Sequence, residues 1–484
     1  MKRKIKILYV TAEISPYANT GGLGEMGRSF PKALIEAGGF EVHRVMPLYR
    51  RIDQQLEYIA DFTVPMEQGY ETCVIKRNQE NLENQENQEN QENQVNEENQ
   101  EIPTYFVKND RYFYRENIYG YEDDGFRFFF FCKAVIEMLK VIDFQPDIIH
   151  LNDWHTGFLA LLLKKEFPKI KTVYTIHNIS YHGFIPATYV RGLLSEAEKK
   201  ELGYPEWLNF MKAGIKYADL VTTVSPGYSR EILQPEASSG MSELLLQKKK
   251  EPVGILNGID MMIYNPANED ELEFPYDLNC LERKKKNRTL LRAQYGIPDV
   301  DKPLLAMVTR LDYSKGIDIL MKALSYIDLS TFQLIILGSG NLYYQGMMAG
   351  ICKVYANNVV VELNYTPEIA KMIYAAADIY LMPSLFEPCG LGQLYAMRYG
   401  AVPVVNPVGG LKDTVVDAGA SENPTGFYMQ NWSGEALCSA LQRAIKEYHS
   451  SGWIQYITNG MNYDSSWKPS ITRYRKCYEE LLED

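Results

Sequence analysis

Paired cysteines, long apolar runs and an excess of positive charge are all missing from this sequence. The seven cysteines are scattered, and no two of them form a CxxC motif. An odd number of scattered thiols is typical of a reducing compartment and argues against a disulfide framework or a cysteine zinc site. No stretch reaches the ~18–20 consecutive apolar residues that a membrane-spanning helix needs.

The charge balance is acidic, with 50 Lys and Arg against 62 Asp and Glu and a net charge of −12. Nucleic acids and anionic membranes need a basic face, so we expect neither as a partner. A small anionic substrate is still allowed, because it needs only a local cluster of Lys and Arg. The N-terminal "MKRKIKILYV" has a short apolar run with interleaved lysines, which predicts a first β-strand rather than a signal peptide. We therefore expect a cytoplasmic protein, or a plastid one after processing if the source is a plant.

Short apolar, β-branched runs alternate with amphipathic helical patterns along the whole chain. This alternation predicts an α/β fold with parallel sheets that helices cover on both faces. At 484 residues the chain is too long for one ordinary core. The predicted strands are 4–10, 41–46, 147–152, 171–177, 220–225 and 252–258 in the first half, and 304–310, 332–338, 358–363, 378–384 and 401–406 in the second half.

A polar, charge-rich segment at 264–302 separates the two groups of strands. We therefore predict two doubly wound, Rossmann-like domains, 1–265 and 266–455, that face each other across a cleft. The segment 78–100 repeats Glu, Asn and Gln and has almost no apolar side chains. It cannot bury enough surface to offset the entropy of ordering, which predicts a disordered surface insertion.

Ligands of open α/β sheets bind beyond the carboxyl ends of the strands, so the polar residues that follow each strand are the candidates. After the first strand, Gly21 and Gly22 begin a helix and would let a phosphate approach backbone N–H groups. Such turns also occur without a ligand. Asp153 follows another strand, and His177 and Asn178 follow the next one. No HExxH or paired CxxC accompanies the histidines, so we predict no metal.

In the second half, Arg310 ends a strand and Lys315 follows five positions later. A diphosphate is the natural partner of such a pair, although a solvated loop pair is an alternative. Glu387 lies in "SLFEPCGLG", whose glycines begin another helix. A carboxylate next to a phosphate is repulsive unless it binds something neutral, such as sugar hydroxyls. This reasoning points to a nucleotide sugar.

Eight motifs in the chain resemble those of the bacterial glycogen synthase and plant starch synthase family, in the family order and spacing. They are "TGGLGE", "LNDWHTG", "TIHN", "TTVSPGYSREI", "GILNGID", "TRLDYSKG", "PSLFEPCGL" and "GGLKDTV". The resemblance implies a GT-B fold, with a C-terminal segment, 456–484, that forms a helix crossing back to the first domain. It also implies transfer of glucose from ADP-glucose to the non-reducing 4-OH of an α-1,4-glucan. The implied reaction retains the anomeric configuration, by double displacement or same-face attack, and needs no metal or other cofactor.

The resemblance also assigns roles to individual residues. Asp153, His177 and Asn257 would surround the glucosyl group, Arg310 and Lys315 would clamp the diphosphate, and Glu387 would hold sugar hydroxyls. Tyr365 would stack on the adenine. The implied substrate-binding set is completed by Asn19, Gly21, Gly22, Glu25, Asn178, Cys389, Gly390, Leu391 and Gly392. Cys389 is expected to serve packing or backbone placement rather than nucleophilic attack.

The chain departs from the family pattern at three of these positions. Asn19 replaces a Lys, Glu25 replaces an Asp, and Gly392 replaces a Thr. Loss of a charge-assisted contact at position 19 would cost about 1.5–3 kcal/mol. Two alternatives therefore stay open: a retaining transferase with another donor, such as UDP-glucose, or another acceptor, and a non-catalytic, glucan-binding homologue.

Overall fold

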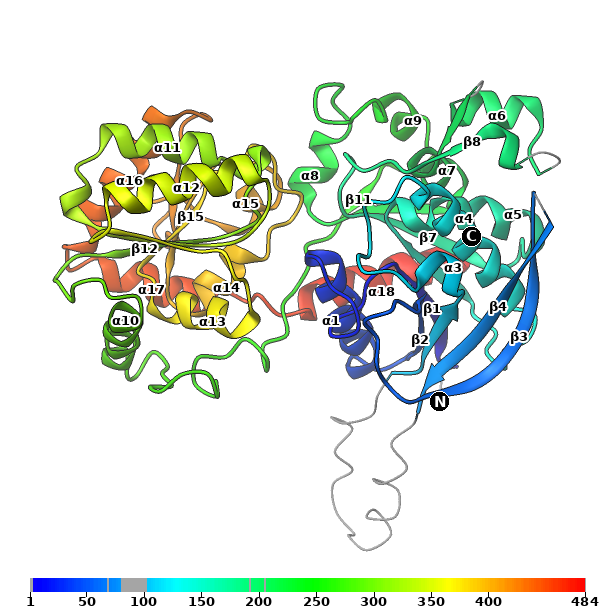
Figure 1. Ribbon diagram of the computed structural model, residues 1–484, viewed down its shortest axis with the longest axis horizontal. Helices are drawn as coiled ribbons and strands as arrows, with labels where there is room; N and C mark the ends of the chain where they lie inside the picture. Colours follow the sequence, from blue (N-terminus) through cyan, green and yellow to red (C-terminus); the bar gives the residue numbers. More distant parts are fainter. Residues whose placement is uncertain (1–2, 68, 80–101, 191–192, 204–205, 484) are drawn as a thin grey trace, which may run out of the picture. The chain divides into compact units, whose positions relative to one another are not determined.

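The computed structural model describes residues 3–67, 69–79, 102–190, 193–203 and 206–483. The chain divides into two compact units (Figure 1). The first unit comprises Met1–Val224, Ser229–Asn257 and Lys468–Asp484, and the second comprises Ser225–Tyr228 and Gly258–Trp467. The boundary lies slightly before the predicted residue 265. The predicted insertion 78–100 lies outside the described residues from residue 80 onward.

The first unit is built on a nine-stranded sheet of order β11-β10-β7-β6-β1-β2-β5-β4-β3. The strands from β11 to β5 pair in parallel, and β4 and β3 are added antiparallel at one edge. The strands are β1 Ile5–Val10, β2 Phe40–Pro47, β3 Leu56–Met66, β4 Gly69–Asn78, β5 Thr104–Lys108, β6 Ile148–Asn152, β7 Lys171–Ile176, β10 Leu220–Thr223 and β11 Val253–Gly254; β8 Phe184–Pro186 and β9 Trp207–Asn209 form a separate hairpin.

Helices pack around this sheet. They are α1 Gly22–Glu36, α3 Asp110–Phe113, α4 Asp124–Met138, α5 Gly157–Glu166, α6 Glu196–Leu202, α7 Phe210–Tyr217, α8 Pro226–Glu231 (which begins in the second unit), α9 Ser242–Leu246 and α18 Lys468–Glu483, with 3-10 turns at Trp154–Thr156 and Ala187–Val190. The central strand β6 is buried along its whole length. Strands covered on both faces read as continuous apolar runs, which is why the sequence predicts them well.

The second unit is a six-stranded sheet of order β14-β13-β12-β15-β16-β17, in which every strand pair is parallel. This is the strand order of a doubly wound dinucleotide-binding fold. The strands are β12 Leu304–Val308, β13 Gln333–Leu337, β14 Val359–Glu362, β15 Ile379–Met382, β16 Val402–Val405 and β17 Phe427–Tyr428; the helices are α10 Glu282–Gln294, α11 Ile317–Tyr326, α12 Leu342–Val354, α13 Pro367–Ala376, α14 Gly392–Arg398, α15 Gly409–Thr414, α16 Gly434–Tyr448 and α17 Trp453–Met461, with 3-10 turns at Tyr313–Lys315 and Leu329–Thr331.

Both faces of the second sheet are buried. Alternate residues of β12 belong to different apolar clusters, with Leu305 and Met307 on one side and Leu304 and Ala306 on the other. Helices α11, α12 and α16 cover one face, and α10, α13 and α14 cover the other (Figure 1). This layering leaves the strand ends as the place where polar side chains can gather.

The predicted C-terminal segment 456–484 spans parts of two helices rather than one. Helix α17 belongs to the second unit, whereas α18 belongs to the first. The polar stretch "NYDSS" at 462–466 separates them, and Pro469 lies in the first turn of α18, where its missing N–H is tolerated. Residues 468–483 therefore return to the first unit as a helix of their own.

Helix α18 is fixed to the sheet of the first unit by a buried hydrogen bond. The Tyr478 hydroxyl lies 2.7 Å from His150 Nδ1 on β6, and the His150 Nε2 lies 2.6 Å from the Thr175 hydroxyl on β7. The ring of Tyr474 packs on Phe30 of α1 with centroids 4.6 Å apart. The helix is thus part of the core of the first unit.

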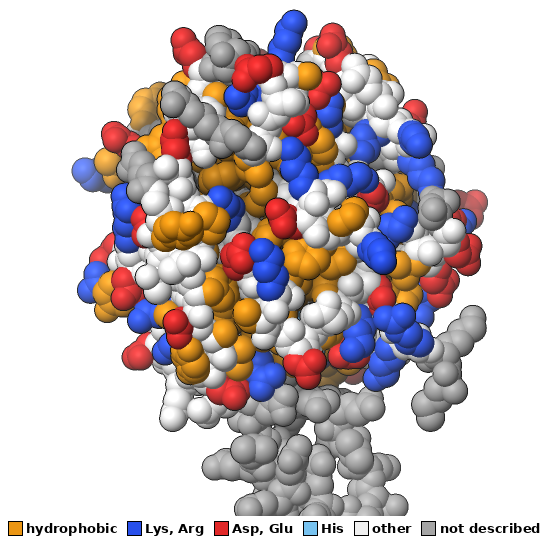
Figure 2. Space-filling view, turned by 90° about the vertical axis from the view of Figure 1, so that its right-hand side faces the viewer, with side chains coloured by type: hydrophobic (Ala, Val, Ile, Leu, Met, Phe, Trp, Pro, Cys, Tyr) orange, Lys and Arg blue, Asp and Glu red, His pale blue; other side chains and the backbone are white. Residues whose placement is uncertain are grey.

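On the face drawn in Figure 2, basic and acidic side chains are interspersed with apolar ones. In the described part of the chain, no helix is long and apolar enough to cross a membrane.

Tyr478→Phe should loosen α18. The substitution leaves the buried His150 Nδ1 without its partner, at a cost of about 1–3 kcal/mol. Amide hydrogen exchange of residues 468–483 should become faster. Tyr217→Phe is the control, because the buried Tyr217 hydroxyl has no hydrogen-bond partner among the described residues. Equal exchange in the parent protein and Tyr478→Phe would contradict the assignment.

Candidate active site

The polar residues predicted in the second half of the chain gather at one edge of the second sheet. β12 and β15 are neighbours, and the chain order reverses between them. Ligands of doubly wound sheets bind at such a switch point, outside the carboxyl ends of the strands. Arg310 and Lys315 follow β12, and Glu387 follows β15. The structure therefore places all three around the switch point.

Lys315 and Glu387 form an ion pair. Lys315 Nζ lies 2.7 Å from Glu387 Oε2, and the side chains are only 17% and 10% exposed. The Ser384 hydroxyl donates to the same carboxylate oxygen over 3.0 Å. The Glu387 carbonyl accepts from the Gly410 N–H at 3.0 Å. The carboxylate is thus neutralised by Lys315, a contact between the two residues that the sequence did not predict.

The pair depends on a close approach of two loops. Gly316 follows Lys315 with a φ of 75°, and a Cβ there would lie 2.1 Å from the Pro383 carbonyl oxygen. Only glycine satisfies both conditions. The Leu385 N–H also donates to the Ser314 carbonyl at 2.8 Å. These contacts hold the loop after β12 against the end of β15.

Arg310 differs from Lys315 in its exposure. Its side chain is 56% exposed, and its Nε lies 4.0 Å from Asp312 Oδ2. The switch point therefore presents two cations, a mostly buried Lys315 and a more exposed Arg310. A bidentate guanidinium and a point-charge ammonium are the combination expected for a diphosphate.

The backbone of the loop after Glu387 is held by a side chain and by close packing. Gly390 has a φ of 72°, and Gln393 Nε2 donates to the carbonyls of Cys389 and Gly390 at 3.1 and 3.0 Å. A Cβ on Gly410 would lie 2.1 Å from the Cys389 carbonyl oxygen. Cys389 is buried, and burial of this kind fits the packing role expected for it. Leu391 precedes α14 directly.

Gly392, one of the three departures from the family pattern, lies against the side chain of Tyr380, which fills the space next to it. A Cβ at this position would lie 2.7 Å from the Tyr380 hydroxyl oxygen, and that hydroxyl donates to the Val308 carbonyl at 3.0 Å. The tyrosine oxygen thus occupies space that a threonine at 392 would need. Burial is the main cause that raises the pKa of Tyr380, and the nearby Tyr365 contributes. Tyr365, predicted to stack on the base, is 54% exposed near this edge.

In the first unit, Asp153 joins the ends of two neighbouring strands. It follows β6, and its Oδ1 accepts from the backbone N–H groups of His177 at 2.8 Å and Asn178 at 3.2 Å, both just past β7. Asp153 has a φ of 55°, which is unusual for a residue other than glycine. Burial raises the pKa of Asp153 to about 7, although the two N–H donors oppose the shift. The Asp153 side chain thus holds the backbone after β7 in place.

His177 is neutral in this environment. Burial lowers the pKa of its ring to about 3. Its Nε2 lies 2.9 Å from Asn152 Oδ1, a residue that the sequence did not single out. The predicted Asn257 has a buried Oδ1 without a hydrogen-bond partner among the described residues. A buried carbonyl oxygen of this kind is normally satisfied, so a ligand hydroxyl is a natural partner.

The two departures after β1 bind each other. Asn19 Nδ2 donates to Glu25 Oε1 at 3.0 Å, and Glu25 Oε2 pairs with Arg28 at 2.7 Å. The Asn19 Oδ1 accepts from the Gly21 N–H at 2.8 Å. The Gly21 N–H, expected to be bare for a phosphate, is thus already satisfied by the Asn19 side chain. Gly22 begins α1.

Two polar residues near the same loop were missed. Glu13 accepts from the Thr20 N–H and hydroxyl at 2.5 and 2.8 Å and from the Tyr119 hydroxyl at 2.6 Å. Glu13 follows β1, so the rule used for Asp153 would have found it. Tyr119 lies in a long loop and gives no such signal in the sequence.

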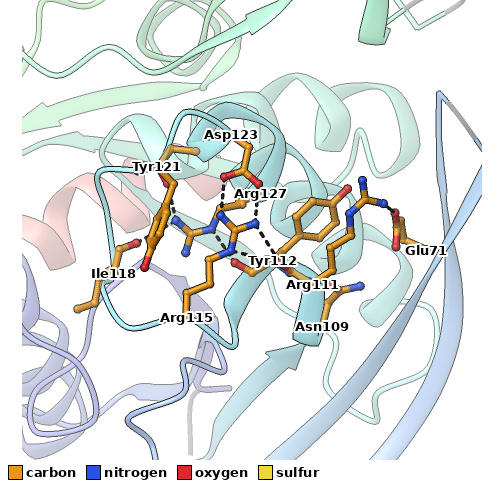
Figure 3. A network of polar contacts seen from close by, with 10 residues as sticks. Glu71, Asn109, Arg111, Tyr112, Arg115, Ile118, Tyr121, Asp123 and Arg127 are labelled. Carbon is orange, nitrogen blue, oxygen red and sulfur yellow. Dashed lines mark hydrogen bonds and ion pairs between the residues drawn. The ribbon is translucent and has the colours of Figure 1, made fainter.

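The loop that carries Tyr119 is braced by arginines (Figure 3). Arg115 binds both carboxylate oxygens of Asp123 at 2.5 Å. Arg127 is fully buried, donates to the Tyr112 and Ile118 carbonyls at 2.6 and 3.2 Å, and lies over the Tyr121 ring. These contacts fix both ends of the segment and with it the position of the Tyr119 hydroxyl.

Comparisons with known proteins agree with this geometry. Residues 6–247 match the family model of the starch synthase catalytic domain, and residues 287–458 match that of the glycosyl transferases group 1. The chain is 40% identical to the glycogen synthase of Moorella thermoacetica over 498 residues, covering 100% of this chain and 98% of that protein. The chain belongs to the glycogen and starch synthase family.

Another glycogen synthase, from Desulforudis audaxviator, is 37% identical over 99% of this chain and 97% of its own length. The solved catalytic domain of starch synthase IV from Arabidopsis thaliana, bound to ADP and acarbose, matches with a TM-score of 0.88 and 28% identity, covering 99% of this chain and 100% of that one. A sucrose-phosphate synthase from Thermosynechococcus elongatus, with a TM-score of 0.64 and 19% identity, shares the fold. The GT-B fold is confirmed, and the chain is a glycosyltransferase of this glycogen and starch synthase family.

The raised pKa of Asp153 predicts a pH-dependent contribution to stability. Because the folded pKa, about 7, lies above the unfolded value, about 3.9, the native state binds more protons between these pH values. The contribution of Asp153 is therefore fully present below about pH 4 and is lost as pH rises through 7. The stability of the parent protein relative to Asp153→Asn should fall from pH 5 to pH 8, measured by urea unfolding. A constant difference would contradict the burial effect.

Restoring the family threonine should fail unless Tyr380 is changed too. In Gly392→Thr, the new Cβ meets the Tyr380 hydroxyl, and overpacking of this kind costs about 1–3 kcal/mol. Adding Tyr380→Phe removes the oxygen and should recover most of the lost stability in thermal unfolding. Equal unfolding temperatures for the single and double variants would rule out the steric match.

Proposed function

We propose that this glycosyltransferase moves glucose from ADP-glucose to the non-reducing 4-OH of an α-1,4-glucan, with retention and without a metal or other cofactor. The observation that carries the proposal is the Lys315–Glu387 pair at the switch point, where a cation suited to a diphosphate lies 2.7 Å from a carboxylate suited to sugar hydroxyls. Family membership and the neighbour bound to ADP and acarbose support the donor and acceptor classes. The cytoplasmic location expected from the sequence stays a prediction.

In the proposed reaction, opposite charges develop on the two sides of the bond that breaks, and each needs a stabilising group of opposite sign. As the C1–O bond to the diphosphate breaks, negative charge grows on the leaving ADP, and Arg310 and Lys315 would stabilise it. The glucosyl group becomes oxocarbenium-like, and the Glu387 carboxylate would accept from its hydroxyls. The acceptor 4-OH would form the new C1–O bond, and its proton would pass to the departing diphosphate oxygen.

The other predicted residues supply binding and orientation in this scheme. Tyr365 would stack on the base, and the backbone of Cys389, Gly390, Leu391 and Gly392 would contact the sugar and phosphate. Asp153, His177, Asn178 and Asn257 would supply the hydrogen bonds of the first unit to the glucosyl group.

A second candidate keeps the reaction but changes the donor or acceptor. The observation that favours it is the hydrogen bond between Asn19 and Glu25, which replaces a lysine that could contact phosphate or sugar. A purified protein tested with ADP-glucose and UDP-glucose, on glycogen and on short maltooligosaccharides, separates the two candidates. Transfer from ADP-glucose to both glucans supports the first, and transfer only from UDP-glucose supports the second. Binding of glucan without transfer from either donor would sink both.

Lys315→Ala should reduce transfer from ADP-glucose by about 100- to 1,000-fold in kcat, the effect of removing one preorganised charge stabiliser. The variant also leaves the Glu387 carboxylate without its cation. Lys446→Ala, on the exposed face of α16 in the same unit, is the control and should keep the parent rate. The measurement is incorporation of labelled glucose into glycogen. A rate for Lys315→Ala within threefold of the control would remove the diphosphate role.

A further inference from the structure

Asn152, the last residue of β6, is buried and uses its whole hydrogen-bonding capacity. Its Nδ2 donates to the Val10 carbonyl at 3.0 Å and the His150 carbonyl at 3.3 Å. Its Oδ1 accepts from the Tyr9 hydroxyl at 3.1 Å and lies 2.9 Å from His177 Nε2. An amide can make two donor and two acceptor contacts of this kind, and all four are made.

These contacts fix which way the amide points. Carbonyl oxygens only accept, so the NH2 group of Asn152 must face Val10 and His150, and its oxygen must face His177. Because that oxygen cannot donate, the hydrogen in the 2.9 Å contact must lie on His177 Nε2. The protonated nitrogen of a histidine is set by the bond that the ring makes. Burial lowers the pKa of His177 to about 3, so the ring carries one proton at neutral pH.

The other ring nitrogen of His177 is then a bare acceptor. Within the described part of the chain, no hydrogen bond to His177 Nδ1 is found, and the side chain is partly exposed. We propose that Asn152 is a positioning residue that holds His177 as the Nε2–H tautomer, so that Nδ1 accepts a hydrogen bond from a sugar hydroxyl. The substrate part of this inference rests on the proposed function, whereas the tautomer part does not.

The groups around His177 are compatible with a neutral ring. Burial lowers the pKa values of His150 and His155, so both stay neutral. Asp153 faces the backbone N–H of His177 rather than the ring, and burial raises its pKa to about 7. Tyr9 reaches the ring only through Asn152. A neutral amide fixes the tautomer without the rise in pKa that a carboxylate at the same place would cause.

The tautomer can be measured directly, without substrate. The chain has only six histidines, so the ring 15N resonances of His177 can be assigned by their absence from His177→Gln. We expect a pyrrole-like Nε2 and a pyridine-like Nδ1 that do not change between pH 5 and pH 8. A protonated Nδ1, or a ring that titrates in this range, would overturn the inference whether or not the protein transfers glucose.

Two variants test the role of Asn152. Asn152→Asp still accepts from Nε2 but adds a negative charge, which raises the pKa of His177 and converts Nδ1 into a donor. The transfer rate of Asn152→Asp should therefore fall as the pH is lowered and the His177 ring becomes protonated. The 15N signals of an imidazolium should appear over the same pH range. Asn152→Leu removes the acceptor and should lower kcat/KM by about ten- to a hundredfold. A single, unchanged Nε2–H tautomer in Asn152→Leu would overturn the proposal.

Tyr9→Phe is the matched control. It removes one donor to the same Asn152 oxygen but leaves the two amide donors that fix its orientation. The Nε2–H tautomer should persist in this variant. If Asn152→Leu does not fold, the 15N spectra of the parent protein and of Asn152→Asp still test the proposal. A proton on His177 Nδ1 in the parent protein would contradict it. A His177 ring in Asn152→Asp that is not an imidazolium at pH 5 would also contradict it.

Discussion

The carboxyl ends of parallel strands meet at one edge of a sheet, and the side chains there must be held by hydrogen bonds that reach from one strand end to the next. Asp153 does this in the first unit, where its carboxylate accepts from the backbone of His177 and Asn178. In the second unit the same task falls to the contact between Lys315 and Glu387. Both contacts join loops that are distant in sequence, so the positions of His177, Lys315 and Glu387 depend on a neighbouring strand end.

The ion pair in the second unit is better explained by function than by stability. A pair that is mostly removed from water gains little over apolar packing, because desolvation offsets its Coulomb attraction. The pair nevertheless keeps a cation mostly out of water, where a bound diphosphate would interact with it strongly. Donor binding would then exchange one partner of Lys315 for another, and Glu387 would turn to the sugar hydroxyls.

The sequence predicted the parallel strands well because buried strands such as β6 and β12 are continuous apolar runs. It also found most of the polar residues at strand ends, since position alone identifies them. It missed the antiparallel β3 and β4, which are half exposed and lack that signal. It also missed two strands with parallel partners, β5 and the two-residue β17. Pairs such as Asn19 with Glu25 and Gly392 with Tyr380 were also missed, because each member looks like an isolated departure until the fold brings its partner close. Asn152 was missed because its contacts with Tyr9 and His177 arise only when neighbouring strands pair.

The most direct test of the account is the structure of the product made from ADP-glucose. Purified protein should be incubated with 13C-labelled ADP-glucose and a maltooligosaccharide, and the new linkage read from 13C NMR spectra. The account predicts labelled glucose in α-1,4 linkage at the non-reducing end, with ADP released in equal amount. A β-linked product, or free glucose without chain extension, would contradict it.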